Sequence, residues 1–330
     1  MELGSPQDWA QRAGALKAGC VLAMGLVITS GSAIAQQSEI ISVQSQQKGR
    51  PVQIAATVYW PSAGGQVPAL VLHHGSTGVN AGLIGMAQRY ANDGVATVVI
   101  DSFKGRGVSS TVQDQSSVTR EDFNFDALAV LKALGGMPRV NPARIGIAGF
   151  SKGAGSTLSS ALISERTAAS VPSNLKYAFH VAFYPSCAVQ PYRPATTGAA
   201  ILMLLGGADT YVGAEPCQVY GQALRAEGAN IEVRVFPDAP HGYDGDQAGG
   251  DPRGQNYSQC VYQQQANGSW LERKTGVMVA GSDGRWMPAA EAKAVAGCRT
   301  LGVSWGPNAE ARRLAHTELR DYVRRYLLGR

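Results

Sequence analysis

Compact apolar runs alternate with segments of helical periodicity along most of this chain. Runs bounded by glycine or proline are typical of buried strands, and apolar residues three or four positions apart are typical of helices. The expected strands lie at residues 52–61, 69–74, 95–100, 144–150, 177–185, 199–207 and 231–237. The expected helices lie at residues 82–94, 120–136, 152–164, 215–228 and 308–328. Residues 36–50 are polar and are expected to form a linker.

Most of the expected strands are apolar throughout rather than alternately apolar and polar. Such strands are covered on both faces, and their alternation with helices predicts an α/β fold with a mostly parallel central sheet and helices on both faces. Residues 242–306 break this rhythm because they are turn-rich and polar, with hairpin-like sequence at 267–286 and a short alanine-rich helix that ends at Cys298. We therefore expect one domain over residues 36–330, with an insertion at about 242–306.

The first 35 residues have the parts of a secretory signal peptide. Arg12 and Lys17 precede an apolar stretch that ends in an Ala-x-Ala pattern at Ala33 and Ala35. These parts predict cleavage after Ala35 and a periplasmic or secreted protein, with no stable membrane association after cleavage. An uncleaved membrane anchor is the alternative, but glycine and serine interrupt the stretch, which is short for a membrane span.

Composition narrows the class of protein further. With 45% hydrophobic and 16% charged residues, the chain can bury a core and is not intrinsically disordered. Its formal charge of +5 is spread along the chain without a basic run, so we expect no nucleic-acid partner. Four cysteines follow the expected cleavage site, namely Cys187, Cys217, Cys260 and Cys298. An even number in an exported protein predicts two disulfides in one of three pairings, and free buried cysteines are the alternative. The four cysteines lack the spacing of metal ligands, so no metal is expected.

A Gly-x-Ser-x-Gly pattern lies between an expected strand and an expected helix, at Gly149, Ser151 and Gly153. A sharp strand–turn–helix bend presents such a serine above the sheet, and a side chain larger than glycine on either side would clash within the bend. The bend also directs the amide of Lys152 toward an oxygen that gains negative charge. Ser151 is therefore the candidate nucleophile, and the alternative is an ordinary serine in a chain rich in glycine, serine and alanine.

A serine nucleophile needs a base at neutral pH. Asp209 follows the expected strand at 199–207, and His241 follows the one at 231–237. Open parallel sheets place their sites at the carboxyl ends of the strands. The chain order Ser151, Asp209, His241 is that of α/β-hydrolases. The three residues are therefore expected to meet.

Other histidines and acids have different expected roles. His180 lies within an apolar strand and is expected in the core, whereas His316 lies on the terminal helix and is expected to be exposed. Asp238 lies on the loop of the candidate base itself, which makes Asp209 the better orienting acid. Asp101 precedes the nucleophile in the chain and is expected to be structural.

Five segments together resemble the dienelactone hydrolase family of α/β-hydrolases, over nearly the whole mature sequence. These segments are VLHHGSTGVN, VVIDSFKGRG, GIAGFSKGAG, LLGGADTYV and PDAPHGYD. The segments IDSFKGRG, FYPSC, EPC and HGYD further resemble an exported branch of the family, in which the two cysteines of the middle region pair. The resemblance implies a catalytic triad in which Ser151 is the nucleophile, His241 is the base and then the acid, and Asp209 orients the imidazole.

The resemblance carries further implications and two departures. Together with chain order, it favours the disulfides Cys187–Cys217 and Cys260–Cys298, the second of which would hold the insertion. The namesake enzymes use a cysteine nucleophile where this chain has Ser151, and they carry a glutamate where this chain has Gly75. In the namesake enzymes that glutamate controls the nucleophile, and this chain lacks it. The resemblance therefore does not extend to dienelactone itself as a substrate.

The loop after the strand at 69–74 has a role implied by the same resemblance. His73 and His74 would shape it, and the backbone amide of Ser76 or Thr77 would be the second oxyanion donor. Together these residues predict an oxyanion pocket between this loop and the Lys152 amide.

The expected function is that of an exported serine hydrolase that cleaves small-molecule carboxylic esters without a cofactor. Candidate substrate contacts are His74, Arg106 and Trp270, although Arg106 could instead be structural. Trp270, with Trp286 and Tyr262, could line an aromatic-ester site or fill a small core. The alternatives are a peptidase or acyltransferase on the same scaffold, or a non-catalytic binding protein of this fold.

Overall fold

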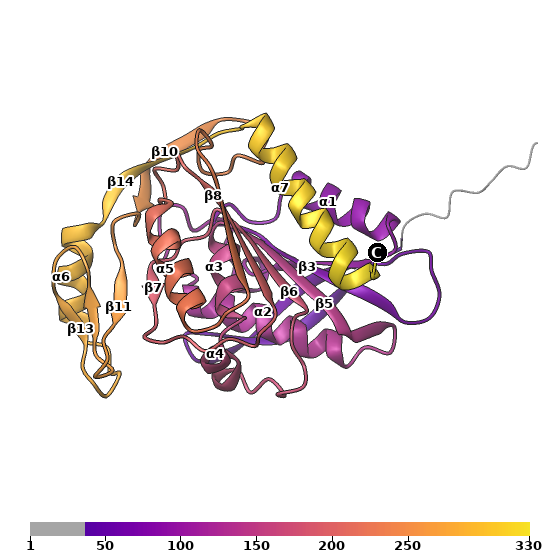
Figure 1. Cartoon of the computed structure of the whole chain (residues 1–330), viewed down its shortest axis with the longest axis horizontal. Helices are drawn as coiled ribbons and strands as arrows, with labels where there is room; N and C mark the ends of the chain where they lie inside the picture. Colours follow the sequence, from indigo (N-terminus) through magenta and orange to yellow (C-terminus); the bar gives the residue numbers. More distant parts are fainter. Residues whose placement is uncertain (1–36) are drawn as a thin grey trace, which may run out of the picture. The chain divides into compact units, whose positions relative to one another are not determined.

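The computed structural model describes residues 37–330, so the expected signal peptide lies outside the described residues. The strands of the central sheet are β1 (Ser38–Gln47), β2 (Arg50–Tyr59), β3 (Val67–His73), β4 (Ala96–Asp101), β5 (Val140–Phe150), β6 (Phe179–Phe183), β8 (Ala200–Gly206) and β9 (Ile231–Phe236). They are arranged in the order β1-β2-β4-β3-β5-β6-β8-β9. Figure 1 labels β3, β5, β6 and β8 of this sheet. β1 and β4 both pair antiparallel with β2, and every other pair is parallel.

Helices cover both faces of this sheet. The side chains of successive strand residues point to opposite faces, so one strand contributes to the core on each side. The helices are α1 (Ala81–Asn92), η1 (Lys104–Arg106), α2 (Arg120–Gly135), α3 (Lys152–Ser159), α4 (Ile163–Ala168), α5 (Glu215–Ala226), α7 (Ala309–Tyr322) and the π-helical η2 (Val323–Leu328). In β8, Leu202 packs in a core cluster with α1 and α7, whereas Ile201 packs in another with α3 and α5. The expected α/β-hydrolase fold with a mostly parallel sheet is confirmed.

The expectation of a linker over residues 36–50 is wrong, because Ser38–Gln47 is the edge strand β1. It pairs along its whole length with β2, from Ser38 opposite Tyr59 to Gln47 opposite Arg50. Val43 is buried and Ile41 is half-buried, and both pack in the core cluster that includes α2. An edge strand buries few side chains, so its polar residues hide the pattern that marks the central strands.

The segment at 242–306 contains two small sheets. β10 (Gly249–Asn256) pairs with β14 (Thr300–Trp305), and we call this pair the ribbon. β11 (Tyr262–Gln264), β12 (Trp270–Glu272) and β13 (Met278–Ala280) form the second sheet, next to helix α6 (Pro288–Cys298). The second sheet also includes β7 (Val189–Gln190), which comes from outside the segment and pairs with β11.

Two disulfides join Cys187 to Cys217 and Cys260 to Cys298, each with Cα atoms 5.0 Å apart. These are the pairings that chain order and the family resemblance favour.

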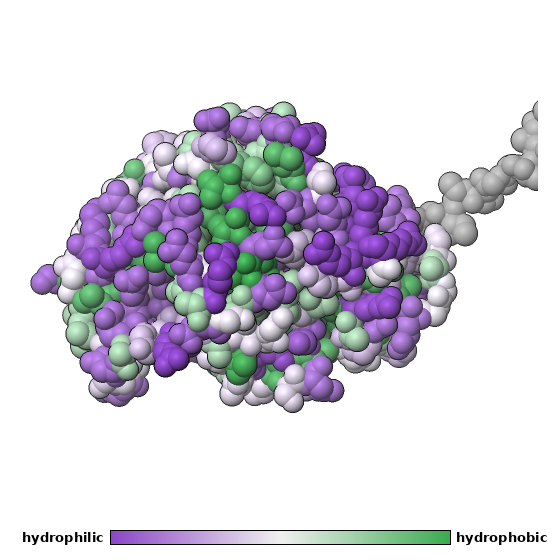
Figure 2. All heavy atoms as spheres, in the orientation of Figure 1, coloured by the Kyte–Doolittle hydropathy of each residue, from purple (hydrophilic) through white to green (hydrophobic). Residues whose placement is uncertain are grey.

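Hydrophilic residues cover much of the face shown in Figure 2, and hydrophobic residues gather near its middle. Between residues 37 and 330, none of the helices is both long enough and apolar enough to cross a membrane.

Candidate active site

Ser151 lies at the sharp bend between β5 and α3. Its backbone has φ 54° and ψ −115°. Residues other than glycine rarely adopt this conformation, which marks local strain. A Cβ atom on Gly149 would lie 2.2 Å from the carbonyl oxygen of Gly153, and one on Gly153 would lie 2.3 Å from that of His73. The bend therefore requires glycine at both positions, as the sequence predicts.

Ser151, His241 and Asp209 form a continuous hydrogen-bonded chain. Nε2 of His241 lies 2.9 Å from Oγ of Ser151, and Nδ1 of His241 lies 2.8 Å from Oδ2 of Asp209. Oδ1 of Asp209 accepts hydrogen bonds from the amides of Tyr211 and Val212 at 2.8 and 3.0 Å. Burial acts to raise the pKa of Asp209, but His241 and these amides outweigh burial and hold that pKa below its ordinary value.

The loops that carry the acid and the histidine run against each other. The amide of Ala208 donates to the carbonyl of Ala239 at 3.1 Å. A Cβ atom on Gly206 would lie 2.5 Å from the same carbonyl oxygen, and one on Gly207 would lie 2.4 Å from that of Pro237. The paired glycines before Asp209 therefore allow the two backbones to approach closely enough for its carboxylate to reach the imidazole.

The loop after β3 approaches Ser151 from another side. A Cβ atom on Gly75 would lie 3.1 Å from Cβ of Ser151, so a larger side chain there would press on the serine. Both Ser76 and Thr77 line the cleft above Ser151. The amide of Lys152 belongs to the first residue of α3, directly after the serine. The structure thus brings together the residues from which oxyanion donors were predicted.

Two buried histidines brace this loop. Nε2 of His73 lies 2.8 Å from Oγ of Ser102, and its Nδ1 lies 2.8 Å from Oγ of Ser156. Nδ1 of His74 donates to the carbonyl of Gly75 at 2.7 Å, and its Nε2 accepts from the amide of Ser102 at 3.1 Å. Burial lowers the pKa of His74 to about 4, so its ring is neutral near pH 7.

Comparison with known proteins identifies the family of this chain. The model of the Dienelactone hydrolase family matches residues 54–279, which is more than half of the chain. The chain belongs to the dienelactone hydrolase family. Membership in this family supports a hydrolase. No curated protein matches the chain closely.

Two solved structures show the same fold at low sequence identity. The first is a dienelactone hydrolase-like promiscuous phosphotriesterase, P91, from metagenomic libraries, with a TM-score of 0.54 and 18% identity over 88% of this chain and 98% of that one. The second is a putative dienelactone hydrolase from Klebsiella pneumoniae, with a TM-score of 0.54 and 15% identity over 88% of this chain and 100% of that one. At these identities the similarity concerns the fold alone.

Ser151, at the bend between β5 and α3, lines a cleft of about 670 Å³. Besides the residues already described, the cleft is lined by Tyr184, Tyr211 and Trp305. The rings of Tyr184 and Tyr211 lie 4.8 and 4.7 Å from that of His241. Sequence reasoning missed all three, although Tyr184 and Tyr211 follow the ends of β6 and β8, where the site of a parallel sheet is expected.

His316 also lines this cleft, so the expectation that it is exposed is wrong. Its side chain is 27% exposed and its ring packs edge-on against Phe183, with centroids 6.0 Å apart. Nε2 of His316 lies 3.8 Å from a carboxylate oxygen of Asp244. The helical pattern of α7 places His316 near its buried stripe, one residue after Ala315, which is fully buried.

Arg106 is structural, which corrects its interpretation as a substrate contact. Its side chain is fully buried in an ion pair with Asp126 at 2.7 Å. The guanidinium also donates to the carbonyls of Gln46 and Ser102, each at 2.6 Å. Arg106 thereby ties β1 to the end of β4 and to α2, and it is not among the residues that line the cleft.

Trp270 is also away from the cleft. It belongs to a small hydrophobic cluster with Tyr262 and the Cys260–Cys298 disulfide. Its ring centroid lies 6.1 Å from that of Trp286, which in turn lies 5.7 Å from that of Tyr262. Of the two interpretations that the sequence left open, the structure supports the small core: Tyr262 and Trp270 pack in this cluster, and none of the three aromatic residues lines the cleft.

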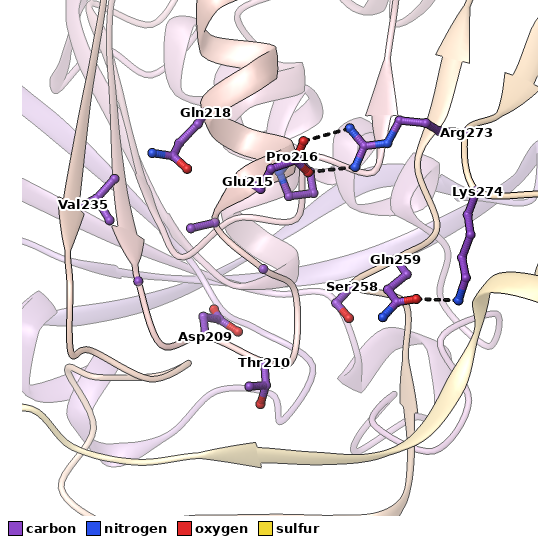
Figure 3. A pocket seen from close by; sticks show the side chains of 13 residues that line it. Asp209, Thr210, Glu215, Pro216, Gln218, Val235, Ser258, Gln259, Arg273 and Lys274 are labelled. Carbon is purple, nitrogen blue, oxygen red and sulfur yellow. Dashed lines mark hydrogen bonds and ion pairs between the residues drawn. The ribbon is translucent and has the colours of Figure 1, made fainter.

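A second hollow of about 680 Å³ borders the acid loop (Figure 3). Asp209 and Thr210 line it together with Glu215, Arg273 and Lys274. Figure 3 shows Arg273 directed at Glu215, with which it forms an ion pair at 2.7 Å. Lys274 donates to the side chain of Gln259, and Asp209 is bound by His241, so each of these charged groups has a partner. Within residues 37–330, no group of three or more His, Cys, Asp or Glu side chains is placed to hold a metal ion.

Proposed function

We propose that this protein is an exported serine hydrolase that cleaves carboxylic esters through an acyl-enzyme on Ser151. One observation carries the proposal, which is the chain of hydrogen bonds from Ser151 through His241 to Asp209, at 2.9 and 2.8 Å. Such a chain gives a serine hydroxyl the base that it needs and gives that base a fixed orientation.

The reaction begins when Oγ of Ser151 attacks the ester carbonyl and transfers its proton to Nε2 of His241. Asp209 accepts from Nδ1 and stabilises the imidazolium that forms. The amide of Lys152 and that of Ser76 or Thr77 stabilise the tetrahedral oxyanion. The imidazolium protonates the departing alkoxide, and a water molecule activated by His241 then releases the acid and restores Ser151.

The cleft favours a small-molecule ester as substrate. Its volume of about 670 Å³ is that of a site for a compact ligand. Aromatic rings from Tyr184, Tyr211 and Trp305 border it, so an apolar acyl or alkyl group can be covered while the carbonyl meets the amides. Charged side chains, among them Arg89, Asp244 and Arg312, line the rest of the cleft. His74 lines the same cleft and remains a candidate substrate contact.

Export is supported by the two disulfides, because such bonds persist in oxidising compartments outside the cytosol. Cleavage after Ala35 is expected to give a mature protein that begins at Gln36. N-terminal sequencing and the mass of the protein recovered from the periplasm or medium test this directly. A protein that retains its first 35 residues would contradict the proposed signal peptide.

Hydrolysis of p-nitrophenyl acetate, butyrate and octanoate tests the activity. Replacing Ser151 by alanine is expected to lower kcat by about 10⁴-fold or more. Ser173→Ala is the matched control, because Ser173 is an exposed serine in the loop before β6. Equal activity in the wild type and Ser151→Ala would contradict the proposal.

The acyl-enzyme and the acid need separate tests. A burst of p-nitrophenol, together with an acylated Ser151 seen by mass spectrometry, is expected for a covalent intermediate. Asp209→Asn is expected to lower kcat by about 10³- to 10⁴-fold, whereas Asp238→Asn, on the loop of His241, should leave it unchanged. Activity confined to amides, or transfer to added alcohols without hydrolysis, would favour the peptidase or the acyltransferase instead.

A further inference from the structure

The side chain of Lys152 turns away from the cleft and binds a neighbouring loop. Its ammonium donates to the carbonyl and the side-chain Oε1 of Gln115, both at 3.1 Å, and to Oγ1 of Thr111 at 3.3 Å. It also donates to the carbonyl of Val118. All these acceptors belong to residues 111–118, between η1 and α2, which we call the clamp loop. One ammonium thus holds both ends and the middle of this loop.

The clamp loop in turn holds the loop that carries the proposed oxyanion donors. The amide of Thr111 donates to the carbonyl of Ser76 at 2.9 Å. Nε2 of Gln115 donates to Oγ of Ser76 at 3.1 Å and to the hydroxyl of Tyr211 at 3.3 Å. The backbone amide of Gln115 donates to Oε1 of Gln255 in the ribbon at 3.0 Å. Gln115 therefore joins the oxyanion loop, the acid loop and the segment at 242–306.

We propose that Lys152 and Gln115 are positioning residues, in which the ammonium of Lys152 fixes Gln115 and Gln115 fixes the Ser76–Thr77 backbone where its amide stabilises the oxyanion. This inference rests on the proposed ester hydrolysis at Ser151. The two side chains act through the loops that they hold, because the Lys152 ammonium is engaged by the clamp loop and Gln115 by Ser76 and Tyr211.

The charge on Lys152 makes this arrangement sensitive to pH. Burial lowers the pKa of Lys152 to about 7, although Asp122 and Asp114 act to raise it. The Phe123 ring, with its centroid 5.3 Å from the ammonium, and the neutral His74 complete the surroundings that bear on this charge. An ammonium offers three N–H groups to these oxygens, whereas a neutral amine offers two and a lone pair. The clamp loop is therefore held less firmly as pH rises through about 7.

Lys152→Met tests the inference because it keeps an unbranched side chain, shorter by one atom, and the backbone amide but removes the charge. We expect kcat for p-nitrophenyl butyrate to fall by about 10- to 100-fold below pH 7, with KM within about twofold, because the donors act on the transition state. The ratio of kcat in the wild type to kcat in Lys152→Met should fall as pH rises from 6 to 9, because the dependence of the reaction on the base His241 is common to both enzymes. Gln115→Ala should lower kcat similarly, and it decides the question if Lys152→Met does not fold.

The matched control is Lys176→Met. Lys176 is an exposed lysine that also donates to a backbone carbonyl, that of Thr197 at 3.0 Å. We expect this variant to keep the kcat and the pH profile of the wild type. A pH profile that is the same in the wild type and Lys152→Met would overturn the inference, because a merely structural lysine would lower stability without changing the profile.

Hydrogen–deuterium exchange separates this inference from the proposed reaction. After correction for the intrinsic pH dependence of exchange, residues 111–118 should exchange about 10-fold faster in Lys152→Met than in the wild type at pH 6, and at nearly equal rates at pH 9. Equal rates at pH 6 would overturn the inference even if esters are cleaved. Activity that survives Ser151→Ala would overturn the proposed reaction instead, while the exchange measurement would still decide whether Lys152 holds the clamp loop.

Discussion

The amide of Gly306 donates a hydrogen bond of 3.0 Å to the carbonyl of His241. The amide of Asn308 likewise donates to the carbonyl of Tyr243 at 3.0 Å. The chain leaves the main sheet after Phe236, passes through the loop that carries His241 and the segment at 242–306, and then returns to bind the backbone of His241. The position of the imidazole therefore depends on the hydrogen bonds from Gly306 and Asn308 as well as on Asp209.

The two disulfides are expected to differ in what they stabilise. Replacing Cys260 and Cys298 by serine should loosen the outer part of the segment, because that bond lies in a small cluster of its own. Since the hydrogen bond from Gly306 to His241 lies outside the closed loop, kcat should change by less than about threefold. Limited proteolysis should show new cleavage within 260–298, and kcat with p-nitrophenyl esters should remain near that of the wild type.

The comparison variant replaces Cys187 and Cys217, which belong to a core cluster with α3 and α5. Loss of this bond should lower the free energy of unfolding of the whole domain by about 2–4 kcal/mol, measured in urea. If removal of Cys260–Cys298 abolishes activity while the domain stays folded, the outer part of the segment takes part in positioning His241.

Two glycines of α3 provide a sharp test of the bend. A Cβ atom on Gly153 would meet backbone oxygens at 2.3 and 2.5 Å, whereas one on Gly155 would have its nearest neighbour at 3.7 Å. Gly153→Ala should therefore displace the bend and abolish esterase activity. Gly155→Ala should keep activity and raise the free energy of unfolding by up to about 1 kcal/mol, because alanine favours the helix. Equal activity of both variants would contradict the tight bend.

The buried ion pair between Arg106 and Asp126 should affect stability rather than substrate affinity. Asp126→Asn leaves the guanidinium buried without its carboxylate and should lower the free energy of unfolding by about 3–5 kcal/mol. KM for p-nitrophenyl esters should stay within about twofold of the wild type, because Arg106 is away from the cleft. Arg193→Met breaks an exposed pair with Glu227 and should cost less than about 1 kcal/mol. A raised KM in Asp126→Asn, at unchanged stability, would restore Arg106 as a substrate contact.

His180 should make the protein less stable in acid. Burial lowers its pKa from 6.5 to about 3, so between these pH values the unfolded chain binds a proton that the folded chain does not. Stability is therefore fully present above pH 6.5 and is lost as pH falls through this window, by about 1.4 kcal/mol per pH unit. In His180→Gln, the slope of unfolding free energy against pH between 6.5 and 4 should be shallower by that amount. Parallel slopes would show that His180 is protonated in the folded state.

Local patterns in the sequence were sufficient for the central strands and for the meeting of Ser151, Asp209 and His241. Strands buried on both faces are apolar throughout, and Ser151 and Asp209 each follow the carboxyl end of such a strand, whereas His241 follows the partly exposed edge strand β9. In a parallel sheet those ends share one edge, so position along the chain already implies proximity in space. The requirement for glycine at 149 and 153 is likewise a property of the bend itself.

Features that depend on a distant partner were decided only by the tertiary structure. The strand β1 is recognised by its pairing with β2. The structural role of Arg106 follows from its burial against Asp126, and the place of His316 in the cleft follows from the packing of α7 over the sheet. The contacts of Lys152 with the clamp loop span 34 to 41 residues of sequence and leave no periodic signal. The residue type of an arginine, a lysine or a histidine in the sequence does not show whether its side chain faces solvent, a carboxylate or a substrate. The fold alone supplies the neighbour that fixes its role.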